Sequence, residues 1–279
     1  MDGLMSEFWI HLAATKQISQ RLRSKSHVGS RSERLINIAS FLTIISDTTD
    51  LNLEPIPWVQ QTSTLKDVVF GDGHGLDFTY GITATLANFI HRTTQLARHI
   101  CFYLLQGDSP PIELTSAAED LWNEILSWDI TQENLEVFSD CDSVTVLIAT
   151  KHMLAFAQSI RIYFYTRVLP CPPSEMTSCI RAVAEILGEI ERIKERTGYN
   201  TVLTATITWP GIIASCEAEP DSREAWSSWW TSMVDYRIGN INDLWTVVKE
   251  AWSSRDQGVN ETPGWAPILR RDGKRILAI

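Results

Sequence analysis

The hydrophobic residues of this 279-residue chain recur at helical spacing along most of its length. Between Ala84 and Leu104 they fall every three or four positions, which is the period of one buried helical face. A similar stripe runs from Ser178 to Arg196, with charged residues on the opposite face. Long amphipathic helices are therefore predicted for both segments. The stripes are Leu86, Ile90, Thr93, Ala97, Ile100 and Leu104 in the first, and Cys179, Val183, Ile186, Leu187, Ile190 and Ile193 in the second.

Capping residues and tryptophans mark further helices. Ser116 stands three residues before Glu119 and just ahead of an apolar run, which is the spacing of a capping box at a helix start. Asn240 suits the N-cap of a later helix. The segment 144–168 is apolar almost all round, which predicts a central helix. A tryptophan stripe marks one more helix, with Trp226, Trp229, Trp230 and Met233.

Strand signals are weak, and the prolines do not separate domains. Residues 201–209, TVLTATITW, alternate β-branched side chains, yet they run straight into Pro210. Because proline is tolerated in the first turn of a helix, a helix that starts near Trp209 also fits. We therefore predict an all-α fold, a single multi-helix domain over residues 1–279 with no DNA-binding domain.

The charge balance is acidic. With 34 Asp and Glu against 24 Lys and Arg, the net charge is -10, so the chain as a whole repels a nucleic-acid backbone. The basic run from Arg21 to Arg34 lacks interleaved aromatic residues and a recognition-helix pattern, and a solvated loop is the preferred interpretation. No nucleic-acid partner is expected.

Cysteine usage and hydropathy indicate an intracellular, soluble protein. Five scattered cysteines make no disulfide framework, and an odd number fits a reducing compartment. The N-terminus has no basic stretch followed by an apolar run, and no window approaches eighteen consecutive apolar residues. No membrane span is expected, and the cytoplasm is favoured over the nucleus.

The sequence offers no metal or cofactor motif. His91 and His99 share one predicted helix, where eight residues of about 1.5 Å each separate them by roughly 12 Å, too far to share an ion. The glycine-rich stretch FGDGHGLD, residues 70–77, lacks the spacing of a phosphate-binding loop. His74 within it could serve as a general base, but a turn before a helix is the preferred interpretation. No cofactor and no metal are predicted.

One face of the predicted central helix combines apolar and hydrogen-bonding side chains. Apolar walls with a few placed polar groups are typical of ligand pockets. The alternative is a packed core in which His152 and Tyr163 are hydrogen-bonded. This face holds Ile148, His152, Ala155, Phe156, Ser159 and Tyr163.

The stretch WPGIIASCEAEP, residues 209–220, places the carboxyl group of Glu217 among apolar residues. A carboxylate in such a helix must be paired, hydrogen-bonded or protonated. Arg161 and Arg167, on or near the central helix, are candidate partners. A structural ion pair is preferred over a catalytic acid.

Several segments together resemble the fungal-specific transcription factor domain, the all-helical regulatory region of fungal zinc-cluster regulators. WPGIIASCEAEPDSREAWSSWW resembles the family's W-P-x-x-x-A-G-C-E-A block, with Ser215 where the family usually has glycine. The other similar segments are FWIHLAATKQI, VVFGDGHGLDFTYGITATLANFIHRTTQLAR, LAFAQSIRIYFYTRVLPCPP, LWTVVKEAWSSRDQG and GWAPILRRDGKRILAI.

The resemblance implies regulation, effector response or dimerisation. DNA recognition is not carried over, because the six cysteines and the basic stretch of the zinc cluster are absent. Our main hypothesis is a stand-alone protein of fungal natural-product biosynthesis whose interior binds a small apolar metabolite and catalyses a cofactor-free cyclisation or isomerisation, such as a pericyclic cycloaddition. Positioning alone lowers such barriers. A truncated regulator or co-regulator that acts through protein contacts is the alternative.

The enzyme hypothesis assigns roles to eight residues. His152, Tyr163 and Arg161 are the candidate catalytic hydrogen-bond donors. Glu217 is named with them, although a structural ion pair is preferred for it. The candidate substrate-binding residues are Ile148, Phe156, Ser159 and Trp209. Either a homodimer or a protein partner is compatible with both hypotheses.

Overall fold

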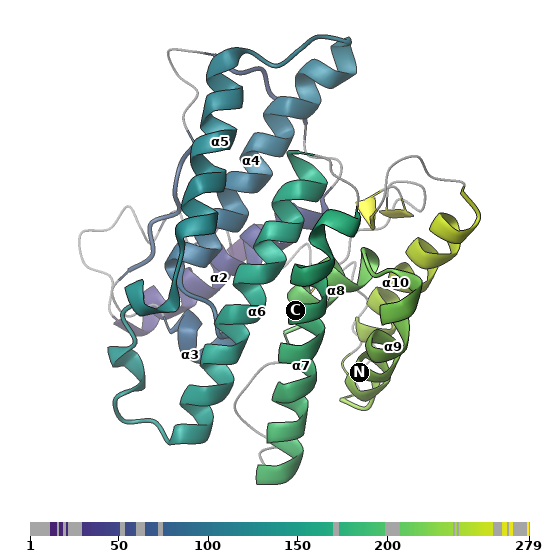
Figure 1. The fold of residues 1–279 in the computed structure, drawn as a ribbon. Helices are drawn as coiled ribbons and strands as arrows, with labels where there is room; N and C mark the ends of the chain where they lie inside the picture. The colour runs from purple at the N-terminus through teal and green to yellow at the C-terminus, as the bar shows by residue number, and fades with distance from the viewer. Residues whose placement is uncertain are drawn as a thin grey trace.

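The regular structure of the chain is helical. The structure, a computed structural model, describes residues 12–15, 17–18, 21, 30–50, 54–59, 65–71, 75–169, 173–198, 207–236, 238, 240–258, 264–266, 268–269 and 278. Every regular element in these ranges is a helix, which confirms the predicted all-α fold (Figure 1). The α-helices are α2 (Ser30–Thr49), α3 (Leu76–Tyr80), α4 (Ala84–Gln106), α5 (Ile112–Ser127), α6 (Ser143–Arg167), α7 (Thr177–Thr197), α8 (Trp209–Cys216), α9 (Arg223–Val234) and α10 (Ile241–Asp256). Short 3-10 turns are η1 (Ile130–Gln132), η2 (Glu136–Phe138), η3 (Pro173–Met176) and η4 (Pro220–Ser222).

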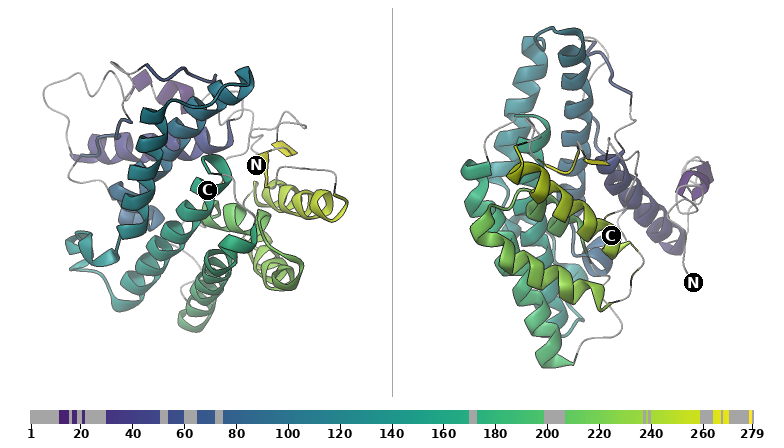
Figure 2. Two further views of the ribbon diagram at one scale, coloured as in Figure 1. Left: turned by 45° about the horizontal axis from the view of Figure 1, so that its top comes forward. Right: turned by 90° about the vertical axis from the view of Figure 1, so that its right-hand side faces the viewer.

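Helix α6 is the centre of the fold, as its nearly uniform apolar sequence predicted. It contacts α3, α4, α5, α7 and α8. Figures 1 and 2 show α4 and α5 on one side of it and α7 to α10 on the other. Its start is fixed by Asp142, whose carboxylate accepts hydrogen bonds from the backbone N–H groups of Val144 and Thr145 at 2.9 and 3.0 Å.

The two predicted amphipathic helices are confirmed as α4 and α7, but the outer end of the α4 stripe differs from the prediction. Leu86, Ile90 and Ala97 are buried, whereas Leu104 is 65% exposed. Figures 1 and 2 show that α4 and α5 extend beyond the end of α6, so the last turn of α4 has no neighbouring layer to cover it. Periodicity predicted the face of the helix and missed where the core ends.

The predicted capping box at Ser116 is wrong. Helix α5 begins at Ile112 with Pro111 in the N-cap position, so Ser116 lies in its second turn. Proline lacks a backbone N–H and has a fixed φ, and both properties suit a helix start. Two adjacent prolines therefore start the helix earlier than the Ser116–Glu119 pair suggested.

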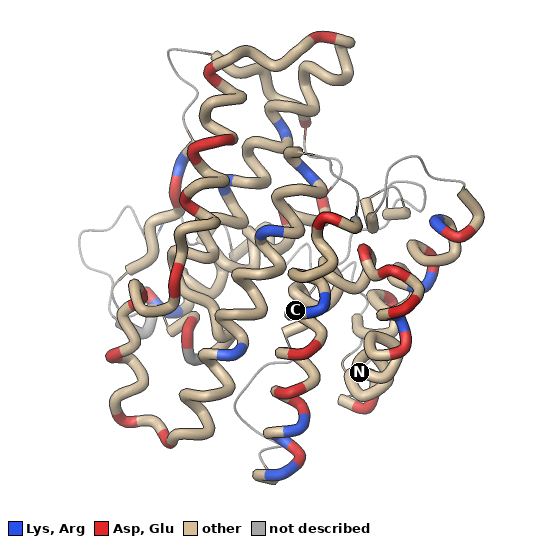
Figure 3. The backbone as a smooth tube through the Cα atoms, viewed as in Figure 1, with Lys and Arg blue, Asp and Glu red and all other residues tan. Residues whose placement is uncertain are grey.

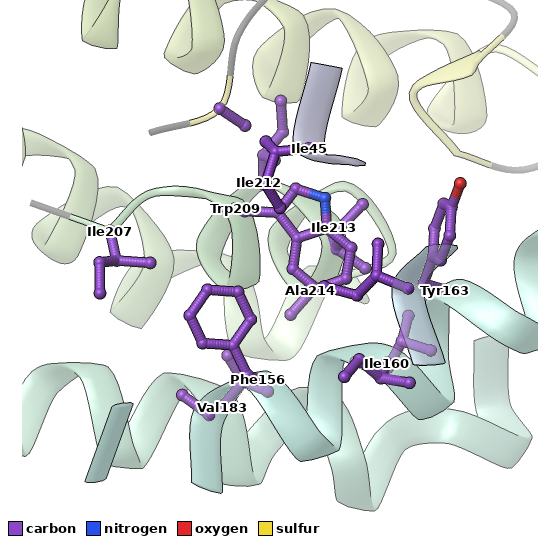
Figure 4. Packing of buried hydrophobic residues seen from close by; sticks show 14 of the residues in the cluster. Ile45, Phe156, Ile160, Tyr163, Val183, Ile207, Trp209, Ile212, Ile213 and Ala214 are labelled. Carbon is purple, nitrogen blue, oxygen red and sulfur yellow. The ribbon is translucent and has the colours of Figure 1, made fainter. Parts of the chain in front are cut away.

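Helix α8 begins at Trp209 with Pro210 in its first turn, as predicted. It lies against α6, α7 and α10. The tryptophan stripe of α9 is confirmed, because Trp226, Trp229 and Trp230 are all buried. One continuous hydrophobic cluster joins α8, α9 and α10 to α6, and the close-up in Figure 4 shows its centre.

Candidate functional site

Helix α8 is buried along its whole length and anchored at its first turn. The indole N–H of Trp209 donates to Oγ1 of Thr48 on α2 at 3.1 Å. The hydroxyl of Ser159 on α6 donates to the carbonyl oxygen of Pro210 at 3.3 Å. Two residues expected to contact a substrate therefore fasten α8 to its neighbours.

Aromatic side chains of α6 enclose Trp209. Phe156 stacks on the indole with the ring centroids 5.7 Å apart, and Tyr163 meets it edge-on at 5.6 Å (Figure 4). The hydroxyl of Tyr163 shares a hydrogen bond with Oγ1 of Thr94 at 3.0 Å, and burial raises the pKa of this tyrosine. Ile148, on the same face of α6, is also buried. These residues form a packed aromatic and aliphatic layer.

His152 lies on the same face of α6 and has no hydrogen-bond partner among the described residues at either ring nitrogen. Burial, together with the positive charge of Lys194, lowers the pKa of its imidazole to about 3. Gly81 lies close by, because a Cβ there would be 2.4 Å from Cβ of His152. His152 is thus a neutral imidazole in apolar surroundings, whereas Tyr163 is hydrogen-bonded.

Of the two candidate arginines, Arg161 lies apart from this layer, whereas Arg167 interacts with the side chain of Tyr163. Arg161 is two positions from both Ser159 and Tyr163, so at about 100° per residue it lies on the opposite side of the helix. Its Nε is buried without a hydrogen-bond partner in the described part of the chain. Arg167 lies with its guanidinium 5.6 Å from the ring centroid of Trp265. Neither arginine forms the ion pair with Glu217 that the sequence suggested.

Glu217 is paired with Arg255 of α10 instead. Its side chain is fully buried, and Oε2 lies 2.9 Å from Nη2 of Arg255. The other oxygen, Oε1, has no hydrogen-bond partner among the described residues. Burial raises the pKa of Glu217 to about 7, although Arg255 opposes the shift. A Cβ on Gly264 would lie 2.7 Å from Oε1, so a residue without a side chain covers the carboxyl group.

Arg255 also binds the C-terminal end of α8 directly. Its Nη2 donates to the carbonyl of Cys216 at 3.0 Å and its Nη1 to that of Ala218 at 3.3 Å. The last carbonyls of a helix have no partner within the helix and carry partial negative charge. One guanidinium therefore satisfies backbone acceptors and the Glu217 carboxyl group together.

Two tryptophans hold the end of α8 through Ser215. The indole N–H of Trp230 donates to Oγ of Ser215 at 3.1 Å, and that of Trp252 donates to its carbonyl oxygen at 2.7 Å. A glycine at this position would supply the carbonyl but not the hydroxyl. Ser215 thus gives the buried Trp230 a hydrogen-bond partner of its own.

A second cluster, which the sequence analysis missed, surrounds Lys194 of α7. Its ammonium group lies 3.0 Å from Oε1 of Glu191 and 5.3 Å from the ring centroid of Tyr236, whose hydroxyl donates to Oε2 of Glu191 at 2.5 Å. Lys194 follows Val183, Leu187 and Ile190 at helical spacing, so its burial could have been predicted. An open cleft of about 250 Å³ lies beside it, lined by Glu191, Glu195, Ser232, Asp235 and Tyr236.

Other candidate features fall partly outside the described residues. His74 lies outside them, as do the basic residues Arg23, Lys25 and His27. In the described ranges, no three His, Cys, Asp or Glu side chains are grouped so that they could hold a metal ion. None of the helices seen there is long and apolar enough to cross a bilayer.

The fold and these contacts define an all-α domain in which a buried Trp-Pro helix packs against the central helix α6. Residues 1–279 match the family described as the fungal specific transcription factor domain, and the chain belongs to that family. It is similar to Arginine metabolism regulation protein II of Saccharomyces cerevisiae (strain ATCC 204508 / S288c), with 22% identity over 259 residues, or 88% of this chain. The match covers 28% of that regulator's length. No solved structure matches the chain.

Proposed function

We propose that this chain is a regulatory domain of fungal transcription that acts by binding another protein, the alternative that the sequence left open. The observation that carries the proposal is the direct contact of Trp209 with Phe156 and Tyr163. These side chains were expected to line a reaction chamber, and their contact supports a structural role. Family membership supports the same function, since the chain belongs to the fungal transcription factor domains.

Polar groups in the block 209–220 and on the facing side of α6 support the proposal as well. The hydroxyl of Ser159 donates a hydrogen bond to α8, and the hydroxyl of Ser215 accepts one from α9. Glu217 pairs with Arg255. Groups that hold helices together are not free to handle a substrate. A role in transcription also calls for a nuclear location, and no observation favours the cytoplasm that the sequence analysis suggested. The net charge of -10 argues for protein contacts over DNA contacts.

A tethering experiment tests this function. The chain is fused to an unrelated sequence-specific DNA-binding domain in a fungal host, and a reporter behind that domain's site is measured. We expect the fusion to change reporter output at least three-fold relative to the DNA-binding domain alone. An output equal to that of the DNA-binding domain alone, with the fusion present at normal level, would refute the proposal.

The cofactor-free cyclase is a second candidate, and His152 is the observation that favours it. A buried imidazole with two unpartnered nitrogens is unusual, because buried polar groups are nearly always hydrogen-bonded. A carbonyl group of an apolar metabolite would accept a hydrogen bond from it. The test is incubation of the purified protein with linear polyene aldehydes, followed by product analysis. A rate and product ratio equal to those in buffer would exclude this candidate.

A further inference from the structure

The outer end of the α4–α5 hairpin exposes three large apolar side chains. Leu104, Leu105 and Ile112 are 65%, 73% and 79% exposed. They come from the last turn of α4 and the first residue of α5, on either side of a five-residue connection. Figures 1 and 2 show this end standing clear of the other helices. We call these three residues the hairpin tip. Exposed large apolar residues with polar neighbours are typical of protein-interaction sites.

The backbone of the hairpin tip is well defined. Gly107, with φ of 74°, donates its N–H to the carbonyl of Leu104 at 3.2 Å, and the N–H of Asp108 donates to the carbonyl of Tyr103 at 2.9 Å. This is a Schellman-type helix end, and Pro111 then fixes the start of α5. A partner would meet apolar side chains on a pre-ordered turn, so binding would not have to order this backbone.

The charge around the hairpin tip has one sign. Residues 99–150 contain ten Asp and Glu and no Lys or Arg, while the other 24 acidic residues are balanced by 24 basic ones. This segment therefore accounts for the whole net charge of -10. Figure 3 shows the acidic residues along α5 and the segment that follows it. Asp108, Glu119 and Asp120 are exposed, and none of the described residues forms an ion pair with them.

Other acids of the segment have internal roles. Glu124 pairs with Arg92 of α4 at 2.6 Å, and Asp142 caps α6. Glu133 accepts hydrogen bonds from Thr83 and from the indole of Trp128. Asp108, Glu119 and Asp120 have no such contact with the described residues, which leaves their charge available to a partner.

We propose that the hairpin tip and the outer face of α5 bind a basic amphipathic helix of a partner protein. Its apolar side would cover Leu104, Leu105 and Ile112, and its Lys or Arg side chains would face the neighbouring acids. A second copy of this chain is the wrong occupant, because it would bring the same negative charge to the interface. The proposal rests on the regulatory function proposed above and names the surface through which it acts.

The first test uses a defined probe, an 18-residue helix of leucine and lysine with leucine on one face, and its counterpart with glutamate for lysine. Binding is measured by fluorescence anisotropy at 150 mM NaCl, where charges more than about 8 Å apart are screened. We expect the lysine peptide to bind at least ten-fold more tightly than the glutamate peptide. Equal affinities, or no binding of the lysine peptide, would overturn the proposal.

Matched variants locate the site. Ile112→Ser is compared with Val69→Ser, which removes an equally exposed apolar residue outside the acidic segment. The double variant Glu119→Lys and Asp120→Lys is compared with Glu185→Lys and Glu224→Lys, which changes the net charge equally at exposed positions on α7 and α9. We expect a five-fold or greater loss of affinity in each hairpin variant and less than a two-fold change in each control. Equal losses in variant and control would overturn the proposal.

Two further readouts separate the possible failures. Sedimentation that shows a dimer dissociated by Ile112→Ser would overturn the proposal in favour of a second copy as occupant. In the tethered reporter, the hairpin variants should abolish the change in output while the controls retain it. A reporter response that survives in every variant would refute the proposed binding surface at the hairpin tip and leave the proposed regulatory function intact. Peptide binding at the hairpin tip without any reporter response refutes the regulatory function instead.

Discussion

Gly211 of α8 lies against the indole ring of Trp229 so closely that no side chain fits between them. A Cβ on Gly211 would be 2.3 Å from Cη2 of Trp229. The ring cannot easily move away, because Trp226 and Trp230 contact it with centroids 5.9 and 4.9 Å apart. The glycine therefore sets how closely α9 approaches α8.

Gly211→Ala should destabilise the fold by about 2 kcal/mol, since overpacking a core costs about 1–3 kcal/mol. The matched control is Gly188→Ala in α7, where nothing lies within 4 Å of the added methyl group. That change should stabilise by about 0.5–1 kcal/mol, because alanine is the better helix residue. Urea unfolding of both variants tests this. Destabilisation of both by the same amount would mean that the Trp229 contact is not the cause.

Ser215→Ala should cost about 1–3 kcal/mol, because it leaves the buried indole N–H of Trp230 without an acceptor. The same substitution in a Trp230→Phe background should cost much less, since no donor is then left unpaired. The double-mutant cycle, measured by urea unfolding, isolates this hydrogen bond. A coupling energy near zero would show that the serine hydroxyl contributes nothing through Trp230.

The sequence predicts a helix well where the signal is local, such as the spacing of apolar residues or a proline at the helix start. Apolar residues at three-to-four spacing predicted α4 and α7, a nearly uniform apolar run predicted α6, and Pro210 located the start of α8. The prediction failed at Ser116, where a stronger local signal, Pro111, starts α5 one turn earlier. It also failed at Leu104, because whether a stripe is covered depends on how far the neighbouring helices extend.

The candidate site was harder to predict, because its contacts join residues far apart in the chain. The sequence singled out Glu217 as a carboxyl group among apolar residues and suggested a cation beside it. Its partner Arg255 is 38 residues away, and its position depends on how α10 packs against α8. Trp252 and Arg255 lie three positions apart on one face of α10, and both contact the end of α8. Their shared helical face was the one local signal in the sequence that Arg255 could reach Glu217. The catalytic roles suggested for His152, Tyr163 and Arg161 stay predictions.

His152→Met should raise stability by about 1–2 kcal/mol at pH 7.5, because it replaces an unpartnered buried imidazole with an apolar side chain. The gain should grow below pH 6.5. The folded-state pKa of about 3 lies below the unfolded value, so acid protonates only the unfolded imidazole and the wild type loses stability as pH falls from 6.5 toward 3. Unfolding free energies of both proteins at pH 7.5 and 5.5 test this. A difference that does not change with pH would mean that His152 titrates normally.

Glu217→Gln should remove a pH dependence of the opposite sign. The pKa of Glu217 is raised to about 7 by burial, above the unfolded value near 4.5, so the folded state holds a proton that the unfolded state releases between these values. The wild type should therefore lose stability relative to Glu217→Gln as pH rises from 4.5 to 7, by about 1.4 kcal/mol for each unit of pKa difference.

The glutamine variant keeps the shape of the carboxyl group, and Arg255 keeps the carbonyl acceptors of Cys216 and Ala218 in it. Arg255→Met is the complementary change. It leaves the buried carboxyl group without its cation. At pH 8 Glu217 must then either ionise without a partner or keep its proton at a cost, so the variant should be destabilised more at pH 8 than at pH 5. Urea unfolding at both pH values measures both effects. If the wild type instead gained stability over Glu217→Gln as pH rises, Glu217 would be ionised throughout, and the pair with Arg255 would outweigh the cost of burying the charge.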